Sequence, residues 1–82
     1  MMMQKDAWRL FKEVLPIGRG SLGLGLGLGL GRVTFAEGGE VYVLKEATTT
    51  TCNLYKDVDG RDELVAKGIG VNGFLAYFNK KG

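Results

Sequence analysis

An uninterrupted alternation of leucine and glycine, LGLGLGLGLG, occupies residues 22–31 and constrains the fold more than any other part of the sequence. A helix has 3.6 residues per turn, so this spacing would scatter the leucines around a helical cylinder. A strand repeats every two residues, and it would place all the leucines of the run on one face, namely Leu22, Leu24, Leu26, Leu28 and Leu30. The run is therefore predicted to be extended.

The glycines make such a strand costly on its own. Each one costs roughly 0.5–1 kcal/mol relative to alanine, because glycine loses more backbone entropy on folding. The cost is offset if another backbone approaches the bare glycine face, or if the leucine faces of several copies meet. A fully buried leucine contributes roughly 1.5–3 kcal/mol, which exceeds the glycine cost. The run therefore indicates assembly rather than catalysis, although perfect alternation is also compatible with an artificial sequence.

The composition supports assembly. The chain has 82 residues, a single cysteine at Cys52 and no histidine. A chain of this length forms one small domain at most, and it buries little apolar surface for each residue that it orders. One cysteine permits no intrachain disulfide, and the lack of histidine removes the commonest general base and metal ligand. We therefore expect a homo-oligomer that has no cofactor and no metal.

The charge distribution indicates neither nucleic acid nor membrane as a partner. Eleven basic and nine acidic residues are spread along the chain, for a net charge of +2, and no basic cluster is present. The N-terminal residues carry charges too early for a secretory signal, which needs an apolar core of about 7–15 residues. The leucine–glycine run is shorter than the roughly 20 apolar residues of a membrane helix.

The chain divides into a helix or anchor at 1–16, an extended oligomerisation segment at 17–35 and a small β module at 36–82. In the first region, Asp6 is the predicted N-cap, and Pro16 ends the helix. An apolar stripe follows helical spacing at i, i+3 and i+7 and consists of Trp8, Phe11 and Leu15. This stripe could dock on the chain's own β core or on a symmetry mate, anchor the chain in a larger protein, or lie on a membrane surface.

The β module is predicted from short runs of β-branched and aromatic residues. Strands are expected at 41–45, 52–56, 64–66 and 74–78, and residues 47–51 read as a polar connection or an edge strand. Turns are expected at 36–39 and 57–60, and Asn72-Gly73 is a strong hairpin signal. The expected fold class is therefore mainly β: a short N-terminal helix, a long extended Gly/Leu segment and a small antiparallel sandwich or meander.

Residues 38–78 also carry a pattern of short motifs. It comprises Val41-Tyr42, Thr48-Thr49-Thr50, Leu54-Tyr55 with Asp57, Gly60, Leu64, and Gly73-Phe74 with Tyr77-Phe78. This half of the chain resembles a small β-sandwich module of bacteriophage tail-fibre, head-fibre and similar appendage proteins. The resemblance implies a structural component of the virion, often trimeric, and it brings no catalytic residues with it.

The sequence departs from that family in two places. Val65-Ala66 stands where the family usually has Asn-Pro, and the family continues past the aromatic strand into a further Gly-Tyr strand, whereas this sequence ends at Gly82. A missing strand would leave an open sheet edge, which is an aggregation hazard unless it is covered. A neighbouring copy of the chain is expected to cover it.

Three features invite a chemical interpretation. The acidic stretch at 57–63 suggests calcium, but Gly60 falls at position four of the loop rather than six, so a solvated turn is expected. Cys52 lacks a histidine base and shares the strand face of Leu54, which favours a buried filler over a nucleophile. The threonines at 48–51 could form a ligand surface, although an exposed β edge is more usual.

These observations lead to one expected function and one alternative. We expect a non-enzymatic structural protein of the phage virion, a fibre, appendage or capsid-associated subunit. It would trimerise through the run leucines, and its N-terminal helix would bind a larger virion protein. The alternative is a membrane-associated small protein that inserts its Trp/Phe helix and its leucine–glycine segment into lipid.

Overall fold

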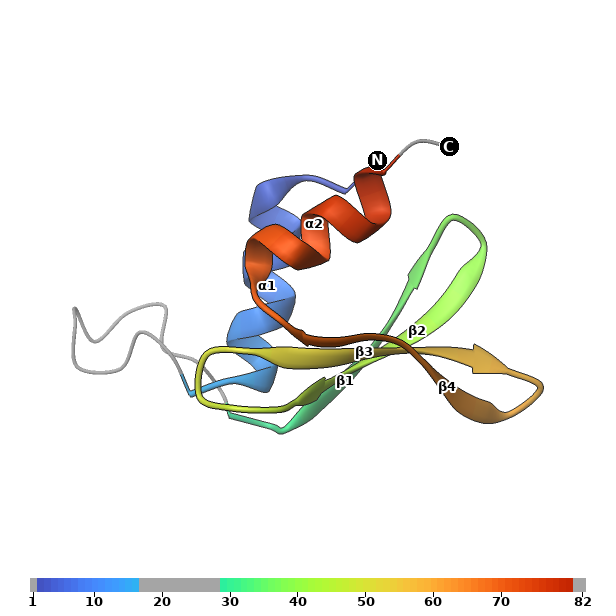
Figure 1. Ribbon diagram of the computed structural model, residues 1–82, viewed down its shortest axis with the longest axis horizontal. Helices are drawn as coiled ribbons and strands as arrows, with labels where there is room; N and C mark the ends of the chain where they lie inside the picture. Colours follow the sequence, from blue (N-terminus) through green and yellow to red (C-terminus); the bar gives the residue numbers. More distant parts are fainter. Residues whose placement is uncertain (1, 17–28, 81–82) are drawn as a thin grey trace.

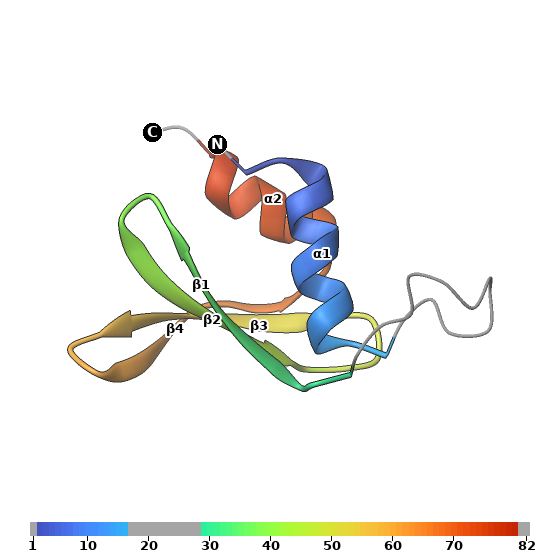
Figure 2. The same ribbon diagram turned by 180° about the vertical axis from the view of Figure 1, so that it is seen from behind.

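The computed structural model describes residues 2–16 and 29–80, which form two helices and one antiparallel sheet of four strands. In chain order the elements are α1 (Gln4–Val14), β1 (Arg32–Glu37), β2 (Glu40–Glu46), β3 (Cys52–Val58), β4 (Arg61–Ile69) and α2 (Val71–Asn79). Each strand pairs with its neighbour in sequence, in the order β1-β2-β3-β4. Both helices cover one face of the sheet, and the β1–β2 and β3–β4 hairpins diverge at their turns (Figures 1 and 2).

Helix α1 forms because its apolar residues recur at i, i+3, i+4 and i+7, which places them on one face. The buried residues are Ala7, Leu10, Phe11 and Val14. The helix begins after Met3, which makes no side-chain cap, and Asp6 lies inside the first turn. The prediction of Asp6 as the N-cap is therefore wrong. An acidic residue in the first turn still interacts favourably with the positive end of the helix dipole.

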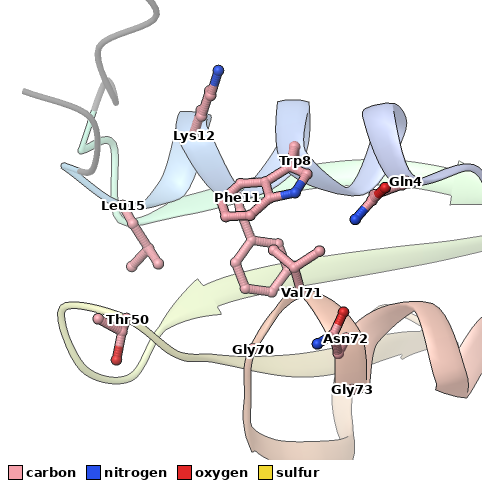
Figure 3. Close-up of a pocket in the computed structure, with 10 residues that line it drawn as sticks. All are labelled: Gln4, Trp8, Phe11, Lys12, Leu15, Thr50, Gly70, Val71, Asn72 and Gly73. Carbon is pink, nitrogen blue, oxygen red and sulfur yellow. The ribbon is translucent and has the colours of Figure 1, made fainter. Parts of the chain in front are cut away.

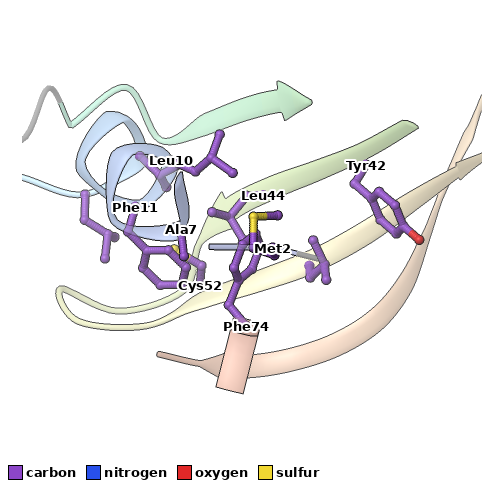
Figure 4. Close-up of a cluster of buried hydrophobic side chains, with 11 residues drawn as sticks. Met2, Ala7, Leu10, Phe11, Tyr42, Leu44, Cys52 and Phe74 are labelled. Atoms are coloured by element: carbon purple, nitrogen blue, oxygen red, sulfur yellow. The ribbon is translucent and has the colours of Figure 1, made fainter. Parts of the chain in front are cut away.

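The hydrophobic core lies between this helical layer and the sheet (Figure 4). Phe11 of α1 and Phe74 of α2 meet edge to face, with ring centroids 5.4 Å apart. Leu44 and Leu54 oppose each other on β2 and β3, and both side chains are fully buried beneath the helices. Helix α1 is thus part of the same core as the β module.

The C-terminal aromatic segment is a helix, so the predicted strand at 74–78 is wrong. Phe74 and Phe78 are four residues apart, and their rings lie 4.9 Å apart on the helix face that contacts Phe35 of β1. Asn72 and Gly73 belong to the first turn of α2 rather than to a hairpin. A five-residue aromatic segment satisfies both the strand and the helix period, and its contacts with the sheet favour the helix.

This change also alters the layers. The predicted short strand at 64–66 extends to nine residues as β4, and the described residues form one open sheet in place of the two sheets of a sandwich. A helical layer covers the apolar face that a second sheet would cover in a sandwich. The fold remains mainly β: it is an open antiparallel meander of four strands with two helices on one face.

The extended segment predicted at 17–35 is described only from Gly29 onward. Gly29 and Gly31 have φ of +63° and +86°, so the backbone bends there and β1 begins at Arg32. Leu22, Leu24, Leu26 and Leu28 lie outside the described residues. The described end of the extended segment therefore bends at 29–31 before β1 begins, where glycine permits a left-handed conformation.

The turn between β1 and β2 permits a direct test of its backbone geometry. Gly38 and Gly39 both have positive φ (+61° and +84°), as the two-residue type I′ hairpin requires. We expect Gly38→Val to lower the free energy of unfolding by about 1–2 kcal/mol, because a β-branched residue is strained at positive φ. The matched change Gly38→Asn should be neutral or slightly stabilising, since asparagine tolerates this region. Equal urea midpoints for the two variants would contradict the assigned turn.

Candidate functional site

An apolar groove lies between α1 and the beginning of α2 (Figure 3). Its volume is about 730 Å³. One wall consists of Gln4, Trp8 and Lys12, which are spaced by four residues and therefore share a ridge of α1. The start of α2 forms the opposite wall, Phe11 lies between the walls, and Leu15 and Thr50 lie at one end.

The structure separates the three residues of the predicted partner anchor. Phe11 and Leu15 are only 1% exposed and belong to the core, as expected if the stripe docks on the chain's own sheet. Trp8 is 42% exposed at the rim of the groove. A partner that approaches α1 would therefore meet mainly Trp8, while Phe11 and Leu15 support the wall from below.

The groove presents surfaces suited to binding an apolar group. The Trp8 indole and the Val71 side chain provide its apolar surfaces, and Lys12 and Asn72 provide polar groups at the rim. Among the described residues that line it, there is no carboxylate and no cysteine. Across residues 2–16 and 29–80, no three acidic or cysteine side chains gather as a metal site would require.

The leucine–glycine run joins the folded domain at a well-defined point. The amide of Leu30 donates to the carbonyl of Glu13 at 2.9 Å, and the amide of Gly31 donates to the carbonyl of Val14 at 3.0 Å. These bonds satisfy carbonyls at the C-terminal end of α1 that have no partner within the helix. The Leu30 side chain is 62% exposed, so the one predicted oligomerisation residue that is described lies outside the core.

Cys52 is a buried core residue. Its side chain is fully buried on β3, and burial, with a smaller contribution from Glu46, raises the pKa of the thiol from 9.0 to about 12. A thiol with so high a pKa carries almost no thiolate at neutral pH and is a poor nucleophile. The interpretation of Cys52 as a buried filler is confirmed.

The acidic stretch forms a tight turn between β3 and β4. The amide of Gly60 donates to Oδ1 of Asp57 at 3.0 Å, and Asp59 adopts a φ of +54°. Asp62 pairs instead with Lys45 across the sheet, at 3.2 Å. Asp57 therefore stabilises the turn, whereas Asp62 forms an ion pair across the sheet. This arrangement agrees with the predicted solvated turn.

The threonines between β2 and β3 form a polar connection rather than an edge strand. The hydroxyls of Thr48 and Thr51 are 2.7 Å apart, and the amides of Thr50 and Thr51 donate to Oγ1 of Thr48. Side-chain oxygens of this kind replace backbone partners in short turns. The threonine run is thus explained by the turn that it builds.

Sequence reasoning did not find a second hollow, of about 590 Å³, at the other end of the domain. Tyr42, Tyr77 and Phe78 meet Glu37 and Glu40 from the β1–β2 turn there. Burial raises the pKa of the Tyr42 hydroxyl, and Tyr77 and Glu40 raise it further. The sequence offered no signal for this hollow, because Tyr77 reaches it only from the helical form of residues 71–79.

The sheet face opposite the helices has no covering layer in the described residues. One cross-strand row on this face consists of Thr34, Val43, Tyr55 and Leu64. The Lys45 ammonium lies 4.7 Å from the centre of the Tyr55 ring. This face is mixed in character, with charged groups among its few apolar side chains.

Comparisons with known proteins provide no relative from which a function could be transferred: no family model, no curated protein and no solved structure matches this chain. Neither helix in the described part of the chain is long and apolar enough to cross a membrane.

Proposed function

We propose that the chain is a non-enzymatic structural subunit that assembles with copies of itself through its leucine–glycine segment. The observation that carries this proposal is the position of Leu30. The core of the described residues is built from the two helices and the sheet, whereas Leu30 is exposed beside the end of α1. A domain that packs its core without Leu30 leaves this end of the run available to another molecule.

The proposed assembly is a trimer in which the leucine faces of three chains meet. The proposed setting is a bacteriophage virion, in which the chain would be a fibre, appendage or capsid-associated subunit. The motifs at 38–64 that resemble such appendage modules support this setting, whereas Gly73-Phe74 and Tyr77-Phe78 lie in a helix and do not. A larger virion protein would bind at the groove beside α1, where Trp8 is accessible.

Replacing Leu26 with aspartate tests the assembly. We expect the purified variant to lose the assembly formed by the leucines, with a lower mass than the wild type, because a carboxylate cannot be buried among leucines without a large desolvation cost. Light scattering after size exclusion measures the mass, and circular dichroism shows whether the domain is folded. The control is Thr49→Asp, which adds the same charge on an exposed turn and should leave the mass unchanged. A folded Leu26→Asp oligomer of wild-type mass would refute the proposed interface.

The alternative function is a membrane-associated protein that inserts Trp8 and the leucine–glycine segment into lipid. The exposed Trp8 indole is the observation that favours it, since tryptophan is enriched at membrane interfaces. Co-sedimentation with phosphatidylcholine and phosphatidylglycerol vesicles separates the two functions. A structural subunit stays in the supernatant, whereas pelleting with a blue shift of Trp8 fluorescence would favour the membrane.

A further inference from the structure

The two edges of the open sheet differ in their protection against pairing. Along β4, the charged residues are Arg61, Asp62, Glu63 and Lys67, and its register with β3 shifts twice. Charges and irregularities of this kind keep an edge from pairing with another strand. Strand β1 carries charges only at its two ends, Arg32 and Glu37, and its register with β2 is regular throughout. The β1 edge is therefore the one suited to accept a further strand.

The orientation of the backbone shows which groups β1 offers at this edge. The amide of Glu46 donates to the carbonyl of Gly31 at 2.9 Å, so Gly31 directs its carbonyl toward β2. Backbone groups in an antiparallel pair alternate in direction along the strand. Val33, Phe35 and Glu37 share the orientation of Gly31. The residues between them, Arg32, Thr34 and Ala36, direct their amides and carbonyls away from the sheet.

We infer that β1 pairs with β1 of a second copy of this chain, antiparallel and about a two-fold axis at Thr34. The three outward residues are symmetric about Thr34, so this register places Thr34 opposite its own copy and Arg32 opposite the partner's Ala36. All of the outward amides and carbonyls of these residues then find partners. A register centred on Phe35 or Val33 would leave Arg32 or Ala36 without an opposite outward residue of the strand.

The side chains suit the same register. Opposite residues in an antiparallel pair share a face. Val33 and Phe35 lie on the helix-covered face and are partly buried at the margin of the core. In the inferred register, Val33 would lie opposite the partner's Phe35, and Phe35 opposite the partner's Val33. On the opposite face, threonine would meet threonine, which is a favourable cross-strand pair. No charged side chain would face a charge of the same sign.

The backbone and side-chain arrangement of β1 favours a second copy of this chain as the partner at the β1 edge. An isologous two-fold contact requires one patch that is complementary to itself, and the symmetric arrangement around Thr34 meets that requirement. The resulting sheet would have β4 and its charges at both outer ends, so strand pairing would stop at two chains. The contact shares no residue with the leucine–glycine run at 22–31, and it does not depend on the function proposed above.

Cysteine cross-linking tests the pairing at single-residue resolution. In the inferred register, the Cα atoms of the two Thr34 residues would lie about 5.5 Å apart, within the range that a disulfide bridges. The two Ala36 residues would lie roughly 14 Å apart, because four residues of strand rise separate them. Thr34→Cys and Ala36→Cys are matched, since both positions are exposed on the same strand and face. The native Cys52 is fully buried and will not compete.

Under mild oxidation with an excess of disulfide exchange reagent, we expect Thr34→Cys to form a covalent dimer at least tenfold faster than Ala36→Cys. A mixture of Arg32→Cys and Ala36→Cys chains should form the mixed dimer preferentially. Thr34→Lys should halve the mass measured by light scattering, because like charges would meet at the axis. The same cross-linking in a Leu26→Asp background keeps this contact separate from the leucine interface.

Three outcomes would overturn the inference. If Thr34→Cys and Ala36→Cys link at equal rates, the contact is a random collision. If Ala36→Cys links faster, the register is wrong. If neither links and Thr34→Lys leaves the mass unchanged while the domain remains folded, the β1 edge does not pair with its copy.

Discussion

Replacing Phe74 with alanine is expected to lower the free energy of unfolding by about 3–5 kcal/mol, the usual cost of truncating a buried aromatic side chain. Phe74 is fully buried and joins the two layers of the fold. Its ring lies 5.4 Å from that of Phe11 on α1 and 5.7 Å from that of Phe35 on β1. Truncation would open a cavity between both helices and the sheet. Urea denaturation followed by circular dichroism measures the effect.

A loss this large approaches the total stability of a small domain, so a milder variant keeps the prediction measurable. Phe74→Leu retains most of the side-chain volume and should cost less than about 1.5 kcal/mol. Leu64→Ala provides the surface control, because Leu64 lies on the uncovered face and is half exposed. Its cost should be within about 0.5 kcal/mol of zero. A Phe74→Ala variant as stable as Leu64→Ala would show that α2 does not pack on the core.

The second large effect is expected at alkaline pH. The buried Cys52 thiol has a pKa of about 12, against 9.0 for an exposed thiol. Below pH 9 both the folded and the unfolded chain keep this proton, so the thiol adds no pH dependence. Between about pH 9 and 12, the unfolded chain loses the proton while the folded chain retains it. Stability should therefore fall with rising pH, by on the order of 1 kcal/mol for each pH unit.

Comparison with Cys52→Ala isolates this contribution, because tyrosines and lysines titrate in the same range in both proteins. The variant loses some packing, but its free energy of unfolding should fall less steeply above pH 9. Alkylation with iodoacetamide gives an independent readout. At pH 8 the folded protein should react at least a hundredfold more slowly than the protein in urea, since burial removes both access and thiolate. Equal slopes and equal alkylation rates would show that Cys52 is accessible.

Local sequence patterns were sufficient for most of the sheet and for α1. The alternation around Val41 and Leu54 predicted β2 and β3, and Gly38-Gly39 and Asp59-Gly60 predicted the turns beside them, whereas β1 was assigned to the extended segment at 17–35. The apolar spacing of residues 7–15 predicted the amphipathic helix α1, although the predicted stripe included Trp8, which is exposed. In each case a periodic signal extended over six or more residues or was bounded by residues that favour turns, so tertiary contacts had little to decide.

The candidate groove could be predicted only in part. The sequence identified Trp8 and Phe11 as neighbours on an apolar stripe. Which of the two is accessible depends on how α1 is rotated over the sheet. The opposite wall comes from Gly70 and Val71, more than fifty residues away, and it exists because the following segment is helical. No pattern within either segment reports that they lie side by side.

By itself, the sequence determined that residues 41–66 contain the strands of an antiparallel sheet, that an amphipathic helix lies within residues 1–16, and that Cys52 is a buried apolar residue. These outcomes rest on periodicity and turn chemistry, which act over a few residues. The tertiary structure alone decided that residues 71–79 are helical and that the second layer consists of helices. The aromatic run fits either period, and it adopts the one in which Phe74 and Phe78 pack on Phe35. Packing between distant segments is a property of the assembled core, which no single segment encodes.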